Sequence, residues 1–178
     1  GAFAGLVLYT YLAARFWPVL LLLFLAYLAV VDRPAVRRKA RGPMMAATAA
    51  VIVFLPLGLH FQRHPGDFTQ RADQVLAWRQ TAGLDLVRAL VRNFVATARG
   101  ALGSGDPRWH YNLPGRAMLQ PWLAVFFAAG VLRSARRWRE PRFALPLLWL
   151  IVLALPGVLT LEMQPAGQRI FGVHPALT

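Results

Sequence analysis

Long blocks of apolar residues, separated by short basic segments, dominate this sequence. Soluble domains are typically about 45–50% apolar and distribute those residues along amphipathic elements. Here hydrophobic residues make up 57% of the chain and gather in stretches that approach a membrane-spanning length. The pattern predicts an all-α fold, a polytopic bundle of transmembrane helices. The expected spans are residues 1–14 (the end of a membrane helix), 16–31, 43–59, 118–132 and 143–161.

Two short segments carry half of the basic residues. Residues 32–42 and 133–142 each hold five lysines and arginines, together ten of the twenty in the chain. Basic clusters beside apolar spans follow the positive-inside rule, so both segments are expected to be cytoplasmic loops. A net charge of +13 would favour nucleic acid in a soluble chain. Because the charge flanks apolar spans here, no nucleic-acid partner is expected and the lipid bilayer is the expected surrounding.

The long segment 60–117 is then expected on the extracytoplasmic side as a partly helical insertion. Residues 83–99 have the spacing of an amphipathic helix, with arginines between the apolar positions. This helix either lies flat in the membrane interface or packs on the spans. Its apolar positions include Leu84, Val87, Val91, Phe94, Val95 and Ala98.

Metal binding is not expected from the residue types present. The chain has no cysteine, so thiolate sites and disulfides are excluded. His60 and His64 share the i, i+4 spacing of a metal-binding pair, but no third ligand is close in sequence. The alternative is that both histidines are interfacial residues at the end of the second span.

The stretch 106–116 is the richest in polar side chains. It crowds Asp106, His110, Asn112 and Arg116 between turn residues just before a span. Such loops often carry function, although a re-entrant turn that caps and anchors the following helix explains the same residues.

Four further residues are candidates because of their positions beside apolar runs. Arg15 lies between two such runs, where an arginine binds a lipid phosphate or reaches ordinary headgroups. Tyr11 adds a hydroxyl at a similar depth. Glu162 and Arg169 follow the last span, as a carboxylate and a cation near the membrane surface or as its solvated flank.

Several segments, in order along nearly the whole chain, resemble bacterial GT-C membrane glycosyltransferases. The most similar group is the protein-mannosyltransferase-like one (glycosyltransferase family 39, PMT/ArnT-type) of environmental bacteria such as the Chloroflexi. The matching segments are GLVLYTYLAARFWPVLLLLF, RHPGDFTQRADQV, GDPRWHYNLPGRAML and LPGVLTLE. Within them, the GDP-to-NLPGR stretch is the most specific piece.

The resemblance implies a GT-C fold and an enzyme of the bacterial plasma membrane. Such enzymes transfer a sugar from a polyprenyl-phosphate donor to a protein, lipid or glycan acceptor on the extracytoplasmic face, and some members need a divalent metal. A carboxylate base deprotonates the acceptor while cations stabilise the leaving phosphate. The residues that the resemblance leaves as candidates for binding substrate or lipid phosphate are Tyr11, Arg15, His110, Asn112, Arg116, Glu162 and Arg169.

The sequence departs from the family in its acidic residues. The family places its base near an early Asp-Glu or Asp-Asp pair, and this chain contains neither pair. We therefore expect both ends to be truncations, the catalytic loop to lie upstream of Gly1, and this part alone to be inactive. The alternatives are an O-antigen ligase or polymerase-type enzyme, or a transporter or permease fragment. A transporter should carry charges deep inside its spans, and these spans carry none.

Overall fold

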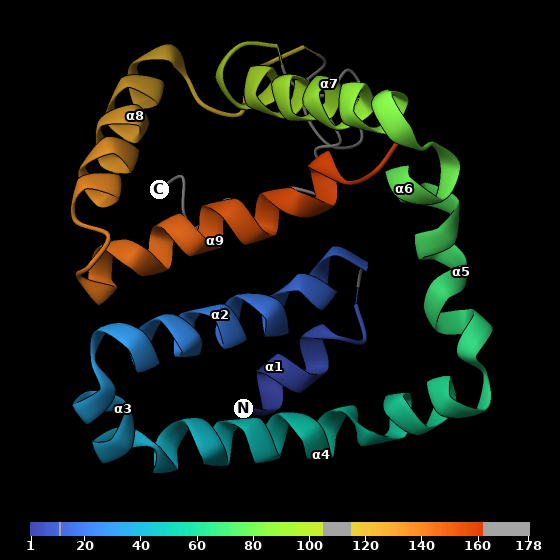
Figure 1. The fold of residues 1–178 in the computed structure, drawn as a ribbon, viewed down its shortest axis with the longest axis vertical. Coiled ribbons are helices and arrows are strands. Elements are labelled where there is room, and N and C mark those ends of the chain that lie inside the picture. Colours follow the sequence, from blue (N-terminus) through green and yellow to red (C-terminus); the bar gives the residue numbers. More distant parts are fainter. Residues whose placement is uncertain (11, 105–114, 162–178) are drawn as a thin grey trace. The chain divides into compact units, whose positions relative to one another are not determined.

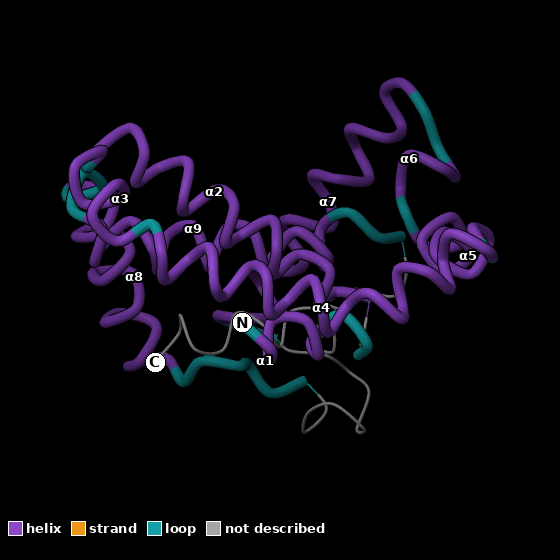
Figure 2. The backbone as a smooth tube through the Cα atoms, turned by 90° about the horizontal axis from the view of Figure 1, so that it is seen from below, coloured by secondary structure: helices purple, strands orange, loops and turns teal. Residues whose placement is uncertain are grey.

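The computed structural model describes residues 1–10, 12–104 and 115–161 of the chain. Every regular element in these ranges is a helix and none is a strand (Figure 1, Figure 2), which confirms the all-α prediction for this part of the chain. The chain divides into two compact units, Gly1–Ala72 and Asp73–Thr178. The boundary falls inside the helix α5 (Pro65–Val75).

Two long apolar helices form the first unit together with shorter segments. α2 (Phe16–Val31) and α4 (Arg41–Arg63) are the long helices, and α3 (Arg33–Lys39) lies between them in sequence. The shorter segments at the start are α1 (Ala2–Val7) and the 3-10 helix η1 (Leu12–Arg15). Figure 1 shows α1 alongside α4, on which it packs.

Small residues allow α1 to approach α4 closely. Gly5 is buried, and a Cβ atom added to it would lie 2.6 Å from the carbonyl oxygen of Ala50 and 2.8 Å from the Cβ of Val53. At Gly1 the corresponding distance to the carbonyl oxygen of Ala46 would be 2.7 Å. Glycines four residues apart thus form the surface on which the two helices meet, as small residues do in membrane helix pairs.

α1 ends well before residue 14, where the sequence predicted the end of the first membrane helix. The amides of Tyr9 and Thr10 bond to carbonyls three residues back, and the Thr10 hydroxyl donates to the carbonyl of Val7 at 2.6 Å. A threonine side chain that bonds to the backbone in this way competes with the helical ladder. The Tyr9 hydroxyl donates to the carbonyl of Val53 in α4 at 2.9 Å, which ties the turn to that helix.

The long helices of the first unit leave most of their apolar side chains exposed. In α4, Met45 is 74% and Ile52 65% exposed, and in α2 Leu22 is 66% exposed. Exposed apolar surface of this extent is costly in water and marks a membrane or interaction surface. Within α2, Leu20 is fully buried.

Four helices lie wholly within the described part of the second unit. They are α6 (Ala77–Gln80), α7 (Gly83–Leu102), α8 (Pro121–Arg136) and α9 (Pro141–Val158). α8 and α9 each begin with a proline, which fits the first turn because its missing N–H would have no helical partner there. Gly83 starts α7 with a φ of +59°, a conformation that other residues rarely adopt. α9 packs against both α7 and α8.

Polar contacts gather around the carboxyl end of α9. The Asn93 side chain of α7 is 1% exposed, and its Nδ2 donates to the carbonyls of Val158 at 3.1 Å and Thr160 at 2.7 Å. The amide of Ala77 donates to the carbonyl of Leu159 at 2.9 Å. These bonds satisfy carbonyls that a helix leaves without an internal partner at its end.

Three helices are long and apolar enough to cross a membrane, among the residues that the structure describes. They are Ala13–Val31, Arg41–Arg63 and Pro141–Val158, and they correspond to the spans predicted at 16–31, 43–59 and 143–161. The second extends to Arg63, beyond the predicted end at residue 59.

The span predicted at 118–132 is not one of these three helices. It coincides with α8, which begins only at Pro121 and carries Arg133 and Arg136 in its last turn. Its 16 residues would extend about 24 Å at ~1.5 Å per residue, which is short of a hydrocarbon core of ~30 Å.

The two segments predicted as loops are partly helical. α3 occupies most of 32–42, because lysine, arginine and alanine are good helix formers and Pro34 stands in the first turn. α8 extends into 133–142 up to Arg136, and only residues 137–140 form a turn. The amphipathic helix predicted at 83–99 lies within α7, and the preceding part of 60–117 contributes α5 and α6 as well.

Candidate functional site

Arg15 lies at the junction of η1 and α2, at one end of a predicted span. Its side chain is partly buried, and its Nη1 donates to the carbonyl of Phe68 in α5 at 2.6 Å. This bond spans 53 residues of sequence and fixes the guanidinium beside the junction between α4 and α5. The arginine that the sequence placed in a membrane-surface turn is therefore held by a specific backbone contact.

Two phenylalanine rings flank the same guanidinium. The Arg15 Cζ lies 4.2 Å from the ring centroid of Phe68 and 5.5 Å from that of Phe61, in the last turns of α4. The two rings meet edge to face, with centroids 5.1 Å apart. An arginine over aromatic faces gains cation–π stabilisation, which is larger where water is excluded. We call Arg15, Phe61 and Phe68 the Arg15 cluster.

Within the described part of the chain, the Arg15 guanidinium retains N–H groups for a further acceptor. A guanidinium carries several N–H donors in one plane, and the Phe68 carbonyl uses one of them. Among the described residues Arg15 forms no ion pair with a carboxylate. Such a planar fork binds a phosphate or a carboxylate through two parallel hydrogen bonds.

A histidine and a carboxylate lie beside this cluster. The His60 Nε2 is 2.9 Å from the Oδ2 of Asp67, and both side chains are about half exposed. The rings of His60 and His64 meet edge to face at 4.8 Å between centroids. No group of three metal-binding side chains occurs in the part of the chain that the structure describes, so the histidine pair has no third ligand there.

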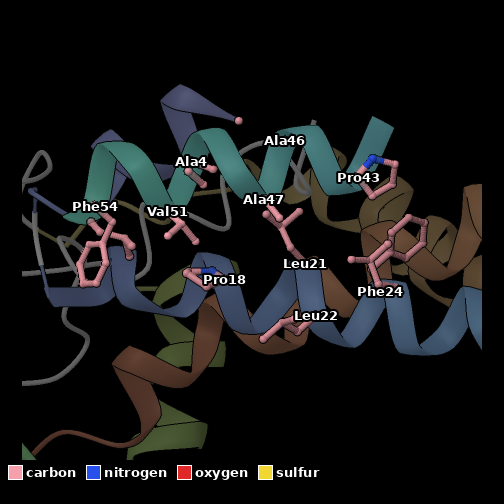
Figure 3. A pocket seen from close by; sticks show the side chains of 14 residues that line it. Ala4, Pro18, Leu21, Leu22, Phe24, Pro43, Ala46, Ala47, Val51 and Phe54 are labelled. Carbon is pink, nitrogen blue, oxygen red and sulfur yellow. The ribbon is translucent and has the colours of Figure 1, made fainter. Parts of the chain in front are cut away.

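An apolar cavity of about 590 Å³ lies between α1, α2 and α4 (Figure 3). Figure 3 shows Pro18 of α2 near Val51 and Phe54 of α4 towards one end, and Phe24 near Pro43 at the other. The walls are almost entirely carbon, and alanines of α4 provide much of the space. The cavity thus offers an apolar slot, wide enough for a hydrocarbon chain, along two helices that are long and apolar enough to cross a membrane.

The Arg15 cluster lies beyond the end of the cavity that Pro18 and Phe54 line. Arg15 precedes Pro18 by one turn, and Phe61 lies two turns beyond Phe54. Arg15 therefore lies beyond one end of the apolar cavity. The basic residues of α3 lie near the opposite end, between the end of α2 and the start of α4 (Figure 1).

Of the other predicted site residues, the structure describes only Arg116. Arg116 is exposed and lies in the second unit, in the stretch 115–120 that hydrogen-bonds to the end of α7 through the amides of Met118 and Leu119. The remaining predicted site residues, which are Tyr11, His110, Asn112, Glu162 and Arg169, lie outside the described residues.

Sequence reasoning missed the partners of Arg15 and the role of Asn93. Phe61 and Phe68 are apolar residues in polar surroundings, a weak signal that could have marked an interfacial contact. Asn93 stands among the apolar residues and arginines of the predicted amphipathic helix. The pattern of that helix does not explain why a carboxamide occupies this position. Its partners are 65 and 67 residues away, a distance that no local pattern reveals.

No protein-family model matches this chain, and neither a curated protein nor a solved structure matches it.

Proposed function

We propose that this chain is part of an integral membrane glycosyltransferase that uses a polyprenyl-phosphate-linked sugar donor on the extracytoplasmic face. In this proposal the acceptor is a protein, lipid or glycan hydroxyl, and the catalytic base comes from another part of the enzyme. The first unit binds the carrier lipid. The observation that carries the proposal is the apolar cavity with the Arg15 cluster beyond one end of it.

The two parts of that arrangement suit the two parts of a polyprenyl phosphate. An isoprenoid chain is uncharged and is stabilised by apolar walls such as those of Leu21, Ala47 and Val51. The phosphate needs a cation that stays in place as negative charge develops on the leaving group. Arg15 meets this need because the Phe68 carbonyl and two rings hold it in position before the donor binds.

Replacement of Arg15 in the full-length enzyme tests the phosphate contact. We expect Arg15→Ala to raise the KM for the polyprenyl-phosphate donor about tenfold or more, because a charge-assisted hydrogen bond contributes roughly 1.5–3 kcal/mol. Arg15→Lys should recover only part of the loss, since lysine keeps the charge without the planar fork. The matched control is Arg63→Ala, which removes an exposed arginine from the last turn of α4. Unchanged donor KM and kcat in Arg15→Ala would reject the assignment.

Filling the cavity tests the lipid contact independently. Ala47→Phe places a ring in the space between α2 and α4. We expect it to raise the KM for a donor with a long isoprenoid chain and to leave a donor with a truncated chain nearly unaffected. Met45→Phe is the control, because Met45 is exposed on α4 and does not line the cavity. Equal effects of Ala47→Phe on both donors would show that the cavity does not hold the chain.

A further inference from the structure

The helix α7 exposes a continuous row of apolar side chains. Leu84 is 75%, Val87 and Val91 are each 57% and Phe94 is 63% exposed, and the exposed Leu102 extends the row at the carboxyl end of the helix. We call these five residues the α7 stripe. The helix is 20 residues long, so the row extends along several turns.

The α7 stripe lies on the side of the helix opposite its buried face. At about 3.6 residues per turn, Val91 and Phe94 point away from Ala89, Asn93 and Gly100, which are the buried residues of α7. The buried face serves the contact with α9. The α7 stripe is therefore a second apolar face, separate from the one that holds the helix in its unit.

Arginines follow one edge of the α7 stripe. Arg88, Arg92 and Arg99 share one flank of the helix, between the stripe and the buried face. Arg88 pairs with Asp85 at 3.3 Å, with both side chains largely exposed. Arg92 and Arg99 form no ion pair with a carboxylate among the described residues. The edge consequently carries net positive charge next to apolar surface.

The contact with α9 sets the depth of α7. α9 is long and apolar enough to cross a membrane, and Asn93 in the middle of α7 bonds to the carbonyls of Val158 and Thr160 at its carboxyl end. The end of a spanning helix lies where hydrocarbon gives way to headgroups. The centre of α7 is thus level with the membrane interface.

We propose that α7 is an interfacial helix that binds anionic phospholipid. Its stripe enters the upper acyl-chain region beside α9, and Arg88, Arg92 and Arg99 contact the phosphate groups of the lipid headgroups. A helix with one apolar face and a cationic edge is the type that lies in the interface plane, and basic residues there favour anionic lipids. This inference does not depend on the proposed sugar transfer.

Single-cysteine spin labels measure the depth of the stripe in the full-length protein reconstituted in vesicles. The described chain has no cysteine of its own, which gives a clean background for this part of the protein. We expect nitroxides at Val91→Cys and Phe94→Cys to collide mainly with oxygen, which partitions into hydrocarbon. A nitroxide at Asp85→Cys, on the polar side, should collide mainly with a water-soluble nickel chelate. Ala89→Cys, on the buried face, should be protected from both reagents.

Two outcomes at Val91→Cys and Phe94→Cys would overturn the proposal. Preferential collision with the nickel chelate would place the stripe in water. Protection from both reagents, as at Ala89→Cys, would show that protein covers the stripe.

The arginine edge is tested by lipid composition. We compare vesicles of phosphatidylcholine alone with vesicles of equal parts phosphatidylcholine and phosphatidylglycerol. The nitroxide at Val91→Cys should collide with oxygen more often, relative to the nickel chelate, in the anionic vesicles than in phosphatidylcholine alone. The double substitution Arg92→Gln and Arg99→Gln should abolish this shift. Arg63→Gln, outside α7, should preserve it. The same shift with and without the two arginines, or no shift in anionic vesicles, would overturn the assignment of the headgroup contact.

Discussion

At the scale of single residues, Asn93 shows how one carboxamide joins segments that are far apart in sequence. Its Nδ2 reaches the carbonyls of Val158 and Thr160, while the Thr160 hydroxyl turns back to the carbonyl of Pro156 at 2.9 Å. Pro156 lies inside α9 and Pro141 begins it. The last carbonyls of a helix have no internal donor, and at the carboxyl end of α9 the Asn93 side chain of α7 supplies one.

Asn93→Leu is expected to destabilise the second unit by about 1–3 kcal/mol, because it leaves one buried and one partly buried carbonyl without this donor at nearly constant volume. The matched control is Thr97→Val, one turn away on the same helix. The Thr97 hydroxyl is buried without a hydrogen-bond partner among the described residues, so its removal should be neutral or stabilising. The measurement is the thermal unfolding midpoint of the purified protein in detergent. Equal midpoints for Asn93→Leu and the wild type would mean that the two bonds contribute nothing to stability.

At the scale of elements, the contact between α1 and α4 depends on the absence of side chains. A Cβ on Gly5 would stand within 2.6 Å of a backbone oxygen of α4, which cannot rotate away. Gly42, near the start of α4, has no atom within 4 Å of the corresponding position. The same substitution at the two glycines therefore separates close packing from helix propensity.

We expect Gly5→Ala to lower the thermal unfolding midpoint, because the clash outweighs the gain of about 1 kcal/mol that alanine brings to a helix. Gly42→Ala should leave the midpoint unchanged or raise it slightly. Detergent-solubilised protein and intrinsic tryptophan fluorescence suffice for the comparison. Equal shifts for both variants would argue against tight packing of α1 on α4.

The sequence indicated the elements that depend on local composition and periodicity. Three apolar runs correspond to helices of spanning character, and the 3.6-residue period located the helix now seen in α7. It did not indicate α3, because charge suggested a loop where the propensity of arginine and lysine favours a helix. The short α1 depends on how Tyr9 and Thr10 bond to their surroundings, and a hydropathy average does not contain that information.

The candidate site could be predicted only in part. Arg15 was identifiable because a lone cation between two apolar runs is conspicuous. Its position over Phe61 and Phe68 depends on the turn from α4 to α5, where His64 ends one helix and Pro65 starts the next. The cavity depends on how α2 and α4 lie together with α1, which is long-range information.

At the scale of the whole molecule, the side of the membrane on which residues 133–142 lie depends on whether α8 crosses the bilayer. If α8 crosses the bilayer, both basic segments are cytoplasmic, as the positive-inside rule predicts. α8 is short for a helix that crosses the bilayer, but Arg133 and Arg136 in its last turn can extend their long side chains to the headgroups. We expect α8 to cross on this basis.

Single cysteines and a membrane-impermeant maleimide test this orientation in intact cells. Thr69→Cys, in α5, should react from outside. Arg38→Cys and Arg139→Cys, one in each basic segment, should react only after the cells are permeabilised. Reaction of Arg139→Cys from outside, with Arg38→Cys still protected, would mean that α8 does not cross.

The polar clamp between Asn93 and the end of α9 has a mechanical consequence. The 18 residues of α9 span about 27 Å, slightly less than a typical hydrocarbon core. If α9 crosses the bilayer, thinning of the membrane below this length would make α9 tilt to restore the match. Because Asn93 bonds α7 to the carboxyl end of α9, α7 would move together with that end. Thinning of the surrounding membrane would thereby be transmitted to α7 and to α6, which contacts it.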